Sequence, residues 1–598
     1  MADKKIVPIN YTSRDFASIR RDLENYAKRY YPDTYKDFNK ASFGSLMLDT
    51  VSYVGDILSF YLDYQTNETF LDSAVEYNNV VRLARQLGYK LKTSPSAFGR
   101  LTFFVEVPAS STGLGPDDTL MPILEAGSTF SSDGGGFYTL LNDVDFSEEG
   151  NQIVVGSADV ATGNPTTYVI RATGMAVSGR GTTQNFTVGD FQRFRRLQLS
   201  MGNISEIIRV VDTEGNAYFE VDHLSQNIIY KAIRNTTTTE STVPNILKAV
   251  PVARRFTVES ISGQTHLQFG YGSDTNLLTN PVVDPTDVVL ELNGRDYTTD
   301  IDFDPTKLID TDKFGIAPSN TTLTVEYRFN TTADVNASVD TITSVSSPLL
   351  KFRNRGALSV SARNNVIRSL EVTNEEQFVG SVSLPSSEEI RQRAFSYFAT
   401  QNRAVTAQDY QALSYGMPAK FGMIKRVAVY RDPAEFKRNV NLYVISESNT
   451  GKLTTANTTL KNNLKNWLLQ YKMISDTIDI LDAEIVNFGV DYEVMIDISA
   501  NRFSVISKCT ERLARLLSTK NDIGEYISIT DIYKELQKVQ GVVDVTSVEV
   551  ALKSGGIYSE SNYDFDSALS ADSRRVLAQP NVIFELKYPN LDIRGSIR

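Results

Sequence analysis

The stretch from residue 42 to residue 64 constrains the fold most, because it is apolar around most of a helical circumference. Its polar side chains form one narrow seam at alternating three- and four-residue spacing, the 3.5-residue period of a coiled coil. The seam consists of Ser42, Ser45, Asp49, Ser52, Asp56, Ser59 and Asp63. A helix on a single surface needs an apolar stripe of only about 100°. Each large apolar side chain left in water forgoes roughly 1.5–3 kcal/mol. The pattern predicts a helix inside a bundle of three or more helices.

Two neighbouring segments of the same chain are also predicted to be helical. The first begins at Thr12 or Ser13 and ends before Pro32, and a later one begins with a capping box at Ser73 and ends at Gly88. In one interpretation these two helices cover residues 42–64 completely. In the other, helices of another chain join them, which the strict 3.5 period favours slightly.

The intermolecular interpretation specifies a contact surface on this helix. Large apolar side chains one heptad apart form two separate ridges, and only one ridge can pack on the helices of the same chain. The predicted partner-binding residues are Phe43, Met47, Tyr53, Val54, Ile57, Leu58, Phe60 and Tyr61. The Ser/Asp seam is then expected to be the least buried face of the helix.

The whole chain is predicted to be a multidomain α+β protein. Its 598 residues are several times the usual domain size. The expected parts are an N-terminal helical bundle segment at 1–98, a central β-rich domain at 99–345 and a C-terminal α+β domain at 346–598. In the last part, helices are expected at 386–400, 406–415, 456–472, 502–519 and 530–539, and strands at 424–430, 439–446, 476–499, 526–529 and 541–551.

Composition argues against two classes of partner. The formal net charge of −12 is the wrong sign for a nucleic-acid binder, which neutralises phosphates with clustered Lys and Arg. No apolar run approaches the roughly 18 residues that a membrane span needs. The first residues also lack the apolar core of a signal peptide, so we expect no secretion by that route.

The residues that most often perform catalysis are scarce. The chain has two histidines, His223 and His266, which lie far apart in strand-like contexts without a catalytic motif. Its one cysteine, Cys509, follows a helical apolar pattern and is predicted to be a buried structural thiol. We therefore predict no catalytic residue and no cofactor, and expect that the protein is not an enzyme.

Two further patterns resemble ligand-binding motifs but lack residues that those motifs require. Asp300, Asp302 and Asp304 alternate as at the start of a calcium loop, but Pro305 stands where the turn glycine belongs and Thr311 where the bidentate glutamate belongs. The segment Asp133-Gly134-Gly135-Gly136 lacks the Lys-Ser/Thr and the helix of a phosphate loop, so it predicts a hairpin turn. No metal site is expected.

Several segments resemble one family of virion proteins. Residues 11–16, 43–49, 56–63 and 82–89 are similar to the T-even-type bacteriophage baseplate wedge protein six family. Residues 384–394, 402–410 and 541–545 resemble the wider baseplate J-like family. Residues 269–272 are similar to the family's Phe-Gly-Asp-Gly turn, with Tyr271 in place of the acidic residue.

This resemblance implies a structural role in the tail baseplate of a contractile-tailed myovirus, with assembly in the host cytoplasm. It implies homodimers that alternate around a sixfold inner ring, N-terminal helices that join a neighbouring wedge protein, and contacts to the central hub and sheath-initiator proteins. The ring would widen during sheath contraction and genome ejection. Together with the heptad pattern, the resemblance favours the intermolecular bundle.

Two other functions compete with this one. A receptor-binding or fibre-attachment tail protein would suit the β-rich segments with many Thr, Asn and Gly residues, and such proteins are commonly trimeric. A tail-associated hydrolase is supported only by the abundance of carboxylates, of which no pair is singled out. The molecular mass in solution distinguishes a dimer from a trimer, and a cleavage assay tests the hydrolase.

Overall fold

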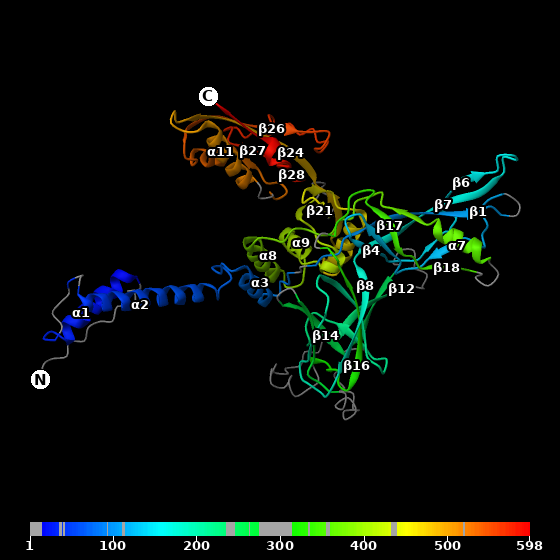
Figure 1. Cartoon of the computed structure of the whole chain (residues 1–598), viewed down its shortest axis with the longest axis horizontal. Helices are drawn as coiled ribbons and strands as arrows, with labels where there is room; N and C mark the ends of the chain where they lie inside the picture. Colours follow the sequence, from blue (N-terminus) through cyan, green and yellow to red (C-terminus); the bar gives the residue numbers. More distant parts are fainter. Residues whose placement is uncertain are drawn as a thin grey trace. The chain divides into compact units, whose positions relative to one another are not determined.

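The computed structural model describes residues 15–34, 39, 42–91, 94–110, 114–234, 245–261, 264–273, 314–332, 335–353, 359–431, 439–517 and 521–598. The chain divides into two compact units (Figure 1). The first comprises Met1–Leu91 and Leu384–Asn402, and the second comprises Lys92–Ser383 and Arg403–Arg598. The predicted fold class, multidomain α+β, is confirmed, whereas the domain boundaries at 98 and 345 stay a prediction.

The first unit is helical. It contains α1 (Phe16–Tyr30), α2 (Phe43–Asn67), α3 (Tyr77–Gln86) and α8 (Ser387–Thr400). Asp15 caps α1 by accepting a hydrogen bond from the backbone N–H of Ser18, and Ser42 caps α2 in the same way through Ser45. The predicted start of the first helix at Thr12 or Ser13 lies outside the described residues. The helix ends at Tyr30, before Pro32, as predicted.

The predicted capping box of α3 is wrong. Ser73 instead donates its hydroxyl to the backbone oxygen of Asn67, and α3 begins one turn later with Glu76 as an N-cap that makes no side-chain cap. Glu68 takes over this role, because its carboxylate accepts hydrogen bonds from the N–H of Val75 and the amide of Asn79. Gly88, at φ +88°, follows the helix as predicted.

Helix α8 packs on α3, although about three hundred residues separate them in the sequence. Its predicted capping box, Ser386 with Glu389, is confirmed. Arg391 donates its Nε to the backbone oxygen of Leu71 at 2.8 Å and an Nη to that of Ala74. The shared core of the two helices consists of Ala74, Val80, Ala84, Tyr89, Ile390 and Ala394.

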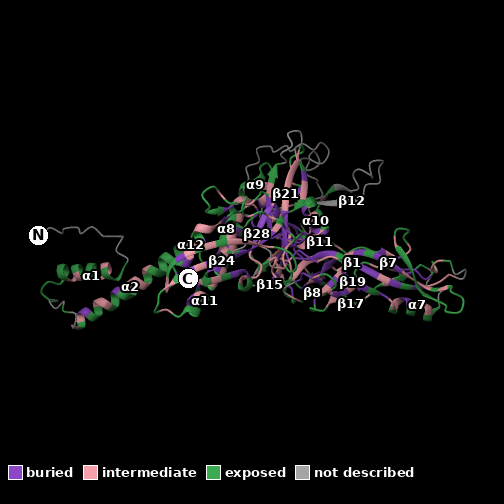
Figure 2. Ribbon diagram, turned by 90° about the horizontal axis from the view of Figure 1, so that it is seen from above, coloured by how far each residue is buried: buried purple, intermediate pink, exposed green. Residues whose placement is uncertain are grey.

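The first half of the second unit is built on two large sheets. The first has the strand order β17 (Ile342–Ser347), β3 (Thr129–Ser132), β4 (Phe137–Leu140), β7 (Pro165–Ser178), β1 (Phe98–Pro108) and β19 (Glu371–Thr373), with β6 (Gln152–Ala158) paired to β7. The second has the order β8 (Arg180–Val188), β16 (Thr321–Phe329), β10 (Ile204–Val211), β11 (Ala217–Glu220), β14 (Arg255–Ile261), β15 (Gln264–Phe269) and β9 (Arg196–Gln198). Alternating apolar residues of these strands form two separate buried clusters. Figure 2 colours the buried residues purple.

Smaller elements complete this half. They are the pair β12 (Ile228–Arg234) with β13 (Asn245–Pro251), the sheet β18 (Leu350–Phe352), β2 (Pro122–Leu124) and β5 (Val144–Asp145), and the helix α7 (Val360–Arg368). The segment from Asp133 to Gly136 connects β3 to β4, which confirms the predicted hairpin turn. Gly135 has φ +79° there, a conformation that a glycine adopts without a steric penalty.

The second half contains two mixed sheets with helices. One holds β20 (Arg426–Arg431), β21 (Asn439–Glu447), β22 (Leu453–Thr454) and β23 (Thr477–Asp482), with α9 (Ala407–Tyr415), η2 (Ala419–Phe421) and α10 (Thr458–Leu468). The other holds β26 (Val542–Lys553), β24 (Glu484–Ile496), β28 (Val582–Glu585) and β29 (Ile593–Ile597), with the pair β25 (Ile527–Ser528) and β27 (Arg575–Val576) and the helices α11 (Arg502–Leu517), α12 (Ile529–Gln537) and α13 (Pro589–Asp592).

The helices predicted for this region are confirmed, with ends that shift by a few residues. One strand prediction is wrong: the stretch 476–499 forms two strands, β23 and β24, instead of one. They separate at Ala483 because they join different sheets. β23 pairs in parallel with β21, whereas β24 pairs with β26 and β28.

A buried ion pair lies where β20 begins. The Nζ of Lys425 is 3.2 Å from Oε2 of Glu447, and both side chains are less than a tenth exposed. The same carboxylate accepts hydrogen bonds from the backbone N–H and the hydroxyl of Ser383, and Lys425 also donates to that hydroxyl. A buried charge pair is tolerated when its hydrogen bonds are satisfied in this way.

Candidate functional site

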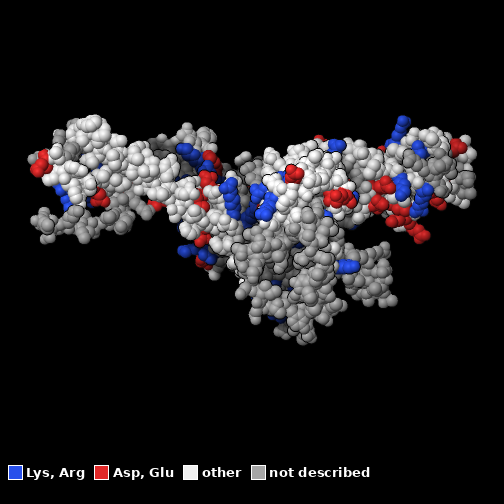
Figure 3. Space-filling view, turned by 90° about the horizontal axis from the view of Figure 1, so that it is seen from below, with Lys and Arg blue, Asp and Glu red and all other residues white. Residues whose placement is uncertain are grey.

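Helix α2 exposes an unusual amount of apolar surface. Phe43 is 72% exposed and Phe60 is 66% exposed, and the buried residues of the helix are Ser45 and Ser52. The exposed large apolar side chains are Phe43, Leu46, Met47, Val51, Tyr53, Val54, Leu58, Phe60, Tyr61, Leu62 and Tyr64. Figure 3 shows few charged side chains on the visible face of this helical segment. Soluble monomers rarely leave so large an apolar patch in water, so such a patch marks an interaction surface.

The polar seam of α2 packs against α1. Arg20 of α1 donates to the hydroxyl of Ser45 at 3.0 Å, and its Nε lies 2.6 Å from Oδ1 of Asp49. On the same face, a Cβ placed on Gly55 would come within 3.2 Å of Ile19, so the small residue permits close approach of the helices. The prediction that the seam is the least buried face is therefore wrong. Small polar residues let α1 pack closely, and the large apolar residues remain outside.

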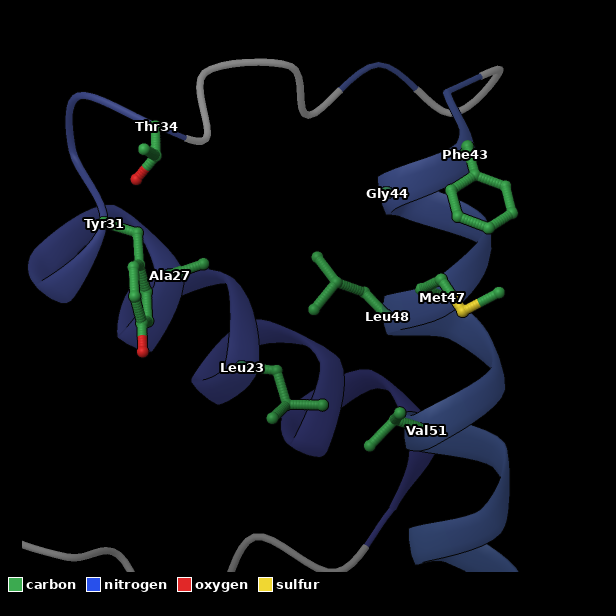
Figure 4. Close-up of a pocket in the computed structure, with 9 residues that line it drawn as sticks. All are labelled: Leu23, Ala27, Tyr31, Thr34, Phe43, Gly44, Met47, Leu48 and Val51. Carbon is green, nitrogen blue, oxygen red and sulfur yellow. The ribbon is translucent and has the colours of Figure 1, made fainter.

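The contact between α1 and α2 leaves an open groove with a volume of about 540 Å³ (Figure 4). Leu23 of α1 and Leu48 of α2 point into the space between the helices. The groove is lined by Leu23, Ala27, Tyr31, Thr34, Phe43, Gly44, Met47, Leu48 and Val51. An apolar groove between two helices has the chemistry that accepts the apolar face of a third helix.

Most of the predicted partner-binding residues are exposed in the isolated chain. Only Ile57 of the eight is partly covered, and Phe43 and Met47 also line the groove. Tyr53 and Phe60 form one ridge of α2, while Met47, Val54 and Tyr61 form the other, as expected from their heptad spacing. Whether a partner covers these ridges stays a prediction.

Sequence reasoning missed the contribution of α1 to this surface. Leu23, Ala27 and Tyr31 line the groove, and Tyr26 and Tyr30 are exposed with ring centroids 4.6 Å apart. The signal was present, because Leu23, Tyr26 and Tyr30 repeat at three- and four-residue spacing. These side chains of α1 were expected only to cover α2, so their own part in the exposed apolar surface was not predicted.

The two histidines lie in different parts of the second large sheet and its connections. His223 lies exposed after β11, and His266 lies in β15 opposite Glu259 of β14 and Gln198 of β9. In the part of the chain that the structure describes, no three His, Cys, Asp or Glu side chains are grouped as metal ligands. Asp300, Asp302 and Asp304 lie outside the described residues. No described helix has the length and apolarity of a membrane span.

Cys509 is buried in α11, as predicted, in a core with Val505 and Leu513. Burial raises the pKa of its thiol to about 11, so the thiol is protonated at neutral pH. We expect a thiol-reactive dye at pH 8 to label the native chain far more slowly than the chain unfolded in guanidinium chloride, because only the thiolate reacts. Equal labelling rates in the two states would contradict this burial.

The N-terminal helical segment is similar to a known protein family. Residues 15–86 match the family model described as "Bacteriophage baseplate protein, N-terminal domain", which supports a baseplate protein. No curated protein sequence matches the chain.

Two solved structures show weak overall similarity. One is a chain of the anti-feeding prophage baseplate, with 10% identity, coverage of 96% of this chain and 99% of that chain, and a TM-score of 0.26. The other belongs to the type VI secretion TssK-TssF-TssG baseplate subcomplex, with 8% identity, coverage of 72% and 96%, and a TM-score of 0.24.

Proposed function

We propose that the chain is a structural subunit of a contractile-tail baseplate, and that α1 and α2 join it to helices of a neighbouring baseplate protein. The observation that carries this proposal is the exposed apolar circumference of α2, which lies within the segment that is similar to baseplate N-terminal domains. The role is architectural, and no catalytic step is assigned to it.

The energetics favour an occupied surface. Each large apolar side chain of α2 regains roughly 1.5–3 kcal/mol when a partner covers it. Two features leave apolar surface in contact with water: the open groove beside Leu23 and Leu48, and the ridge through Tyr53 and Phe60. Ser45 of α2 lies against Arg20 of α1, whereas Tyr53, Phe60 and Tyr61 of the same helix remain exposed. A three- or four-helix bundle shared between chains covers these side chains together.

The finer role is that of a wedge subunit in the virion. We assign the chain to the inner baseplate ring of a myovirus tail, with homodimeric contacts through the region 346–598 and with hub and sheath-initiator proteins as further neighbours. The support is the resemblance of residues 384–410 and 541–545 to the baseplate J-like family. Rearrangement of this ring during sheath contraction would be a two-state change at subunit interfaces.

Light scattering on the full chain tests the homodimer. We expect a mass of twice 66.5 kDa at micromolar concentration. Adding the neighbouring baseplate proteins should shift the chain into a larger complex that electron microscopy identifies as a wedge. A stable trimer that ignores those proteins would contradict the proposal and favour a fibre-attachment role instead.

A further inference from the structure

Strand β6 is an edge strand that is exposed along its whole length. Among the described residues it pairs only with β7, so its outer edge presents unpaired backbone N–H and C=O groups. All seven of its residues are exposed. Figure 1 shows the β6–β7 hairpin projecting beyond the neighbouring strands of its sheet. Such an edge is a template for another strand.

The edge lacks most of the features that normally block pairing. β6 contains no Lys, no Pro and no other charged residue, and it exposes Ile153, Val154 and Val155 in succession. Alternate side chains of a strand point to opposite faces, so apolar groups line both sides of this edge. β-branched side chains favour extended pairing on both of those faces.

The regular part of the edge is short and well defined. Residues 152–155 pair with β7 without interruption, from Gln152 opposite Arg171 to Val155 opposite Tyr168. After Val155 the register shifts around Gly156, where an added Cβ would lie 3.0 Å from the hydroxyl of Thr167. Such an irregularity ends strand pairing, so residues 152–155 are the segment available to a partner.

The charge around β6 identifies the chemistry of that partner. From residue 101 to residue 170 the chain contains no Lys, Arg or His, and its charged residues are Glu106, Asp117, Asp118, Glu125, Asp133, Asp143, Asp145, Glu148, Glu149 and Asp159. Arg171 of β7 lies opposite Gln152 and donates to its side-chain oxygen at 3.2 Å, and the guanidinium group is also paired with Glu375. Glu148 and Glu149 precede β6 and Asp159 follows it, and all three are exposed. Antiparallel pairing of two copies would bring Asp159 of one beside Glu148 and Glu149 of the other. Like charges therefore disfavour a second copy and favour a basic strand.

We propose that the outer edge of β6, over residues 152–155, binds an extended, β-branched segment of another protein that carries Lys or Arg on both sides. The segment adds a strand to the first sheet through backbone hydrogen bonds, with the acidic residues at each end of β6 attracting its basic flanks. This site is independent of the α1–α2 surface.

Fluorescence anisotropy with the full chain tests the proposal. The probe is a short labelled peptide of alternating Val and Thr with two Lys at each end, and its matched partner carries Glu in place of each Lys. We expect the Lys peptide to bind at least about tenfold more tightly than the Glu peptide at low salt, because of the acidic ends of β6. Methylation of one backbone nitrogen that faces β6 should weaken binding about fivefold, because one hydrogen bond is lost.

Two variants locate the binding site. Val154→Lys puts a charge in the middle of the edge, and we expect it to weaken the Lys peptide at least about tenfold. Val339→Lys adds the same charge at an exposed apolar residue in a turn outside the β6–β7 hairpin and should change binding far less. The proposal fails if the Lys peptide does not bind at millimolar concentration, if it binds equally to Val154→Lys, or if the chain self-associates through β6 in a way that Val154→Lys abolishes.

Discussion

Replacing Val54 or Leu58 with Asp should leave the isolated chain folded and weaken its binding to neighbouring baseplate proteins at least about a hundredfold. Val54 is 49% exposed and Leu58 is 58% exposed, so the carboxylate stays in water in the free chain. In a bundle the same carboxylate would be buried without a partner, which costs about 3–5 kcal/mol. Each 1.4 kcal/mol is a factor of ten in the dissociation constant.

The measurement is a titration of each variant against its neighbouring baseplate proteins, with circular dichroism as the check on folding. Gln65→Asp is the matched control, because it adds the same charge at an exposed polar position of α2. We expect this control to bind within a few-fold of the unmodified chain. If Val54→Asp and Leu58→Asp assemble as well as the control, α2 does not form the contact.

Lys425→Met should strongly destabilise the second unit. It removes the ammonium group from beside the buried carboxylate of Glu447, which also accepts hydrogen bonds from Ser383. Breaking a buried pair by removing one partner costs about 3–5 kcal/mol. The loss should appear as a lower midpoint in guanidinium unfolding, followed by the fluorescence of the single tryptophan, Trp467.

Lys461→Met provides the comparison for that loss. Lys461 and Asp482 also form an ion pair, at 2.6 Å, but their side chains are 23% and 39% exposed. Solvent-exposed pairs contribute about 0.2–1 kcal/mol, so this variant should unfold close to the unmodified chain. Equal losses of unfolding free energy for the two lysine variants would show that the buried Lys425 pair contributes no more than the partly exposed Lys461 pair.

Local sequence signals predicted the helices α8 to α12 but did not predict α7, α13 or the strands β27, β28 and β29. The capping box of Ser386 and Glu389 fixes the start of α8, and Thr406 fixes the start of α9, because each cap satisfies backbone donors within one turn. The prediction of a single strand at 476–499 was wrong because no local signal marks the division. Ala483 is an ordinary residue, and the division there follows from which strands lie beside β21 and β24.

Two features could not be obtained from local patterns. The packing of α8 on α3 joins Ile390 to Val80 across a long stretch of chain, and nothing near either residue signals the other. Helix α7 was not predicted, because it is short and contains Asn364 and Asn365, which have low helix propensity.

The candidate site was predicted in part. The heptad pattern identified which side chains of α2 are large and apolar, but the predicted orientation of α2 was reversed. The pattern favoured apolar residues packed on α1 and a seam that faces water. The ion pair of Arg20 with Asp49 and the small size of Ser45 and Ser52 instead stabilise the opposite arrangement.

The most direct test of the proposed bundle is hydroxyl-radical footprinting of α2 in two states, the isolated chain and the assembled baseplate that contains it. Met47, Tyr53, Phe60 and Tyr61 have reactive side chains that are exposed in the isolated chain. We expect all four to be oxidised readily in the isolated chain and strongly protected in the assembly, because partner helices cover them. Equal oxidation in the two states would show that α2 stays exposed, and the proposed function of this helix would be wrong.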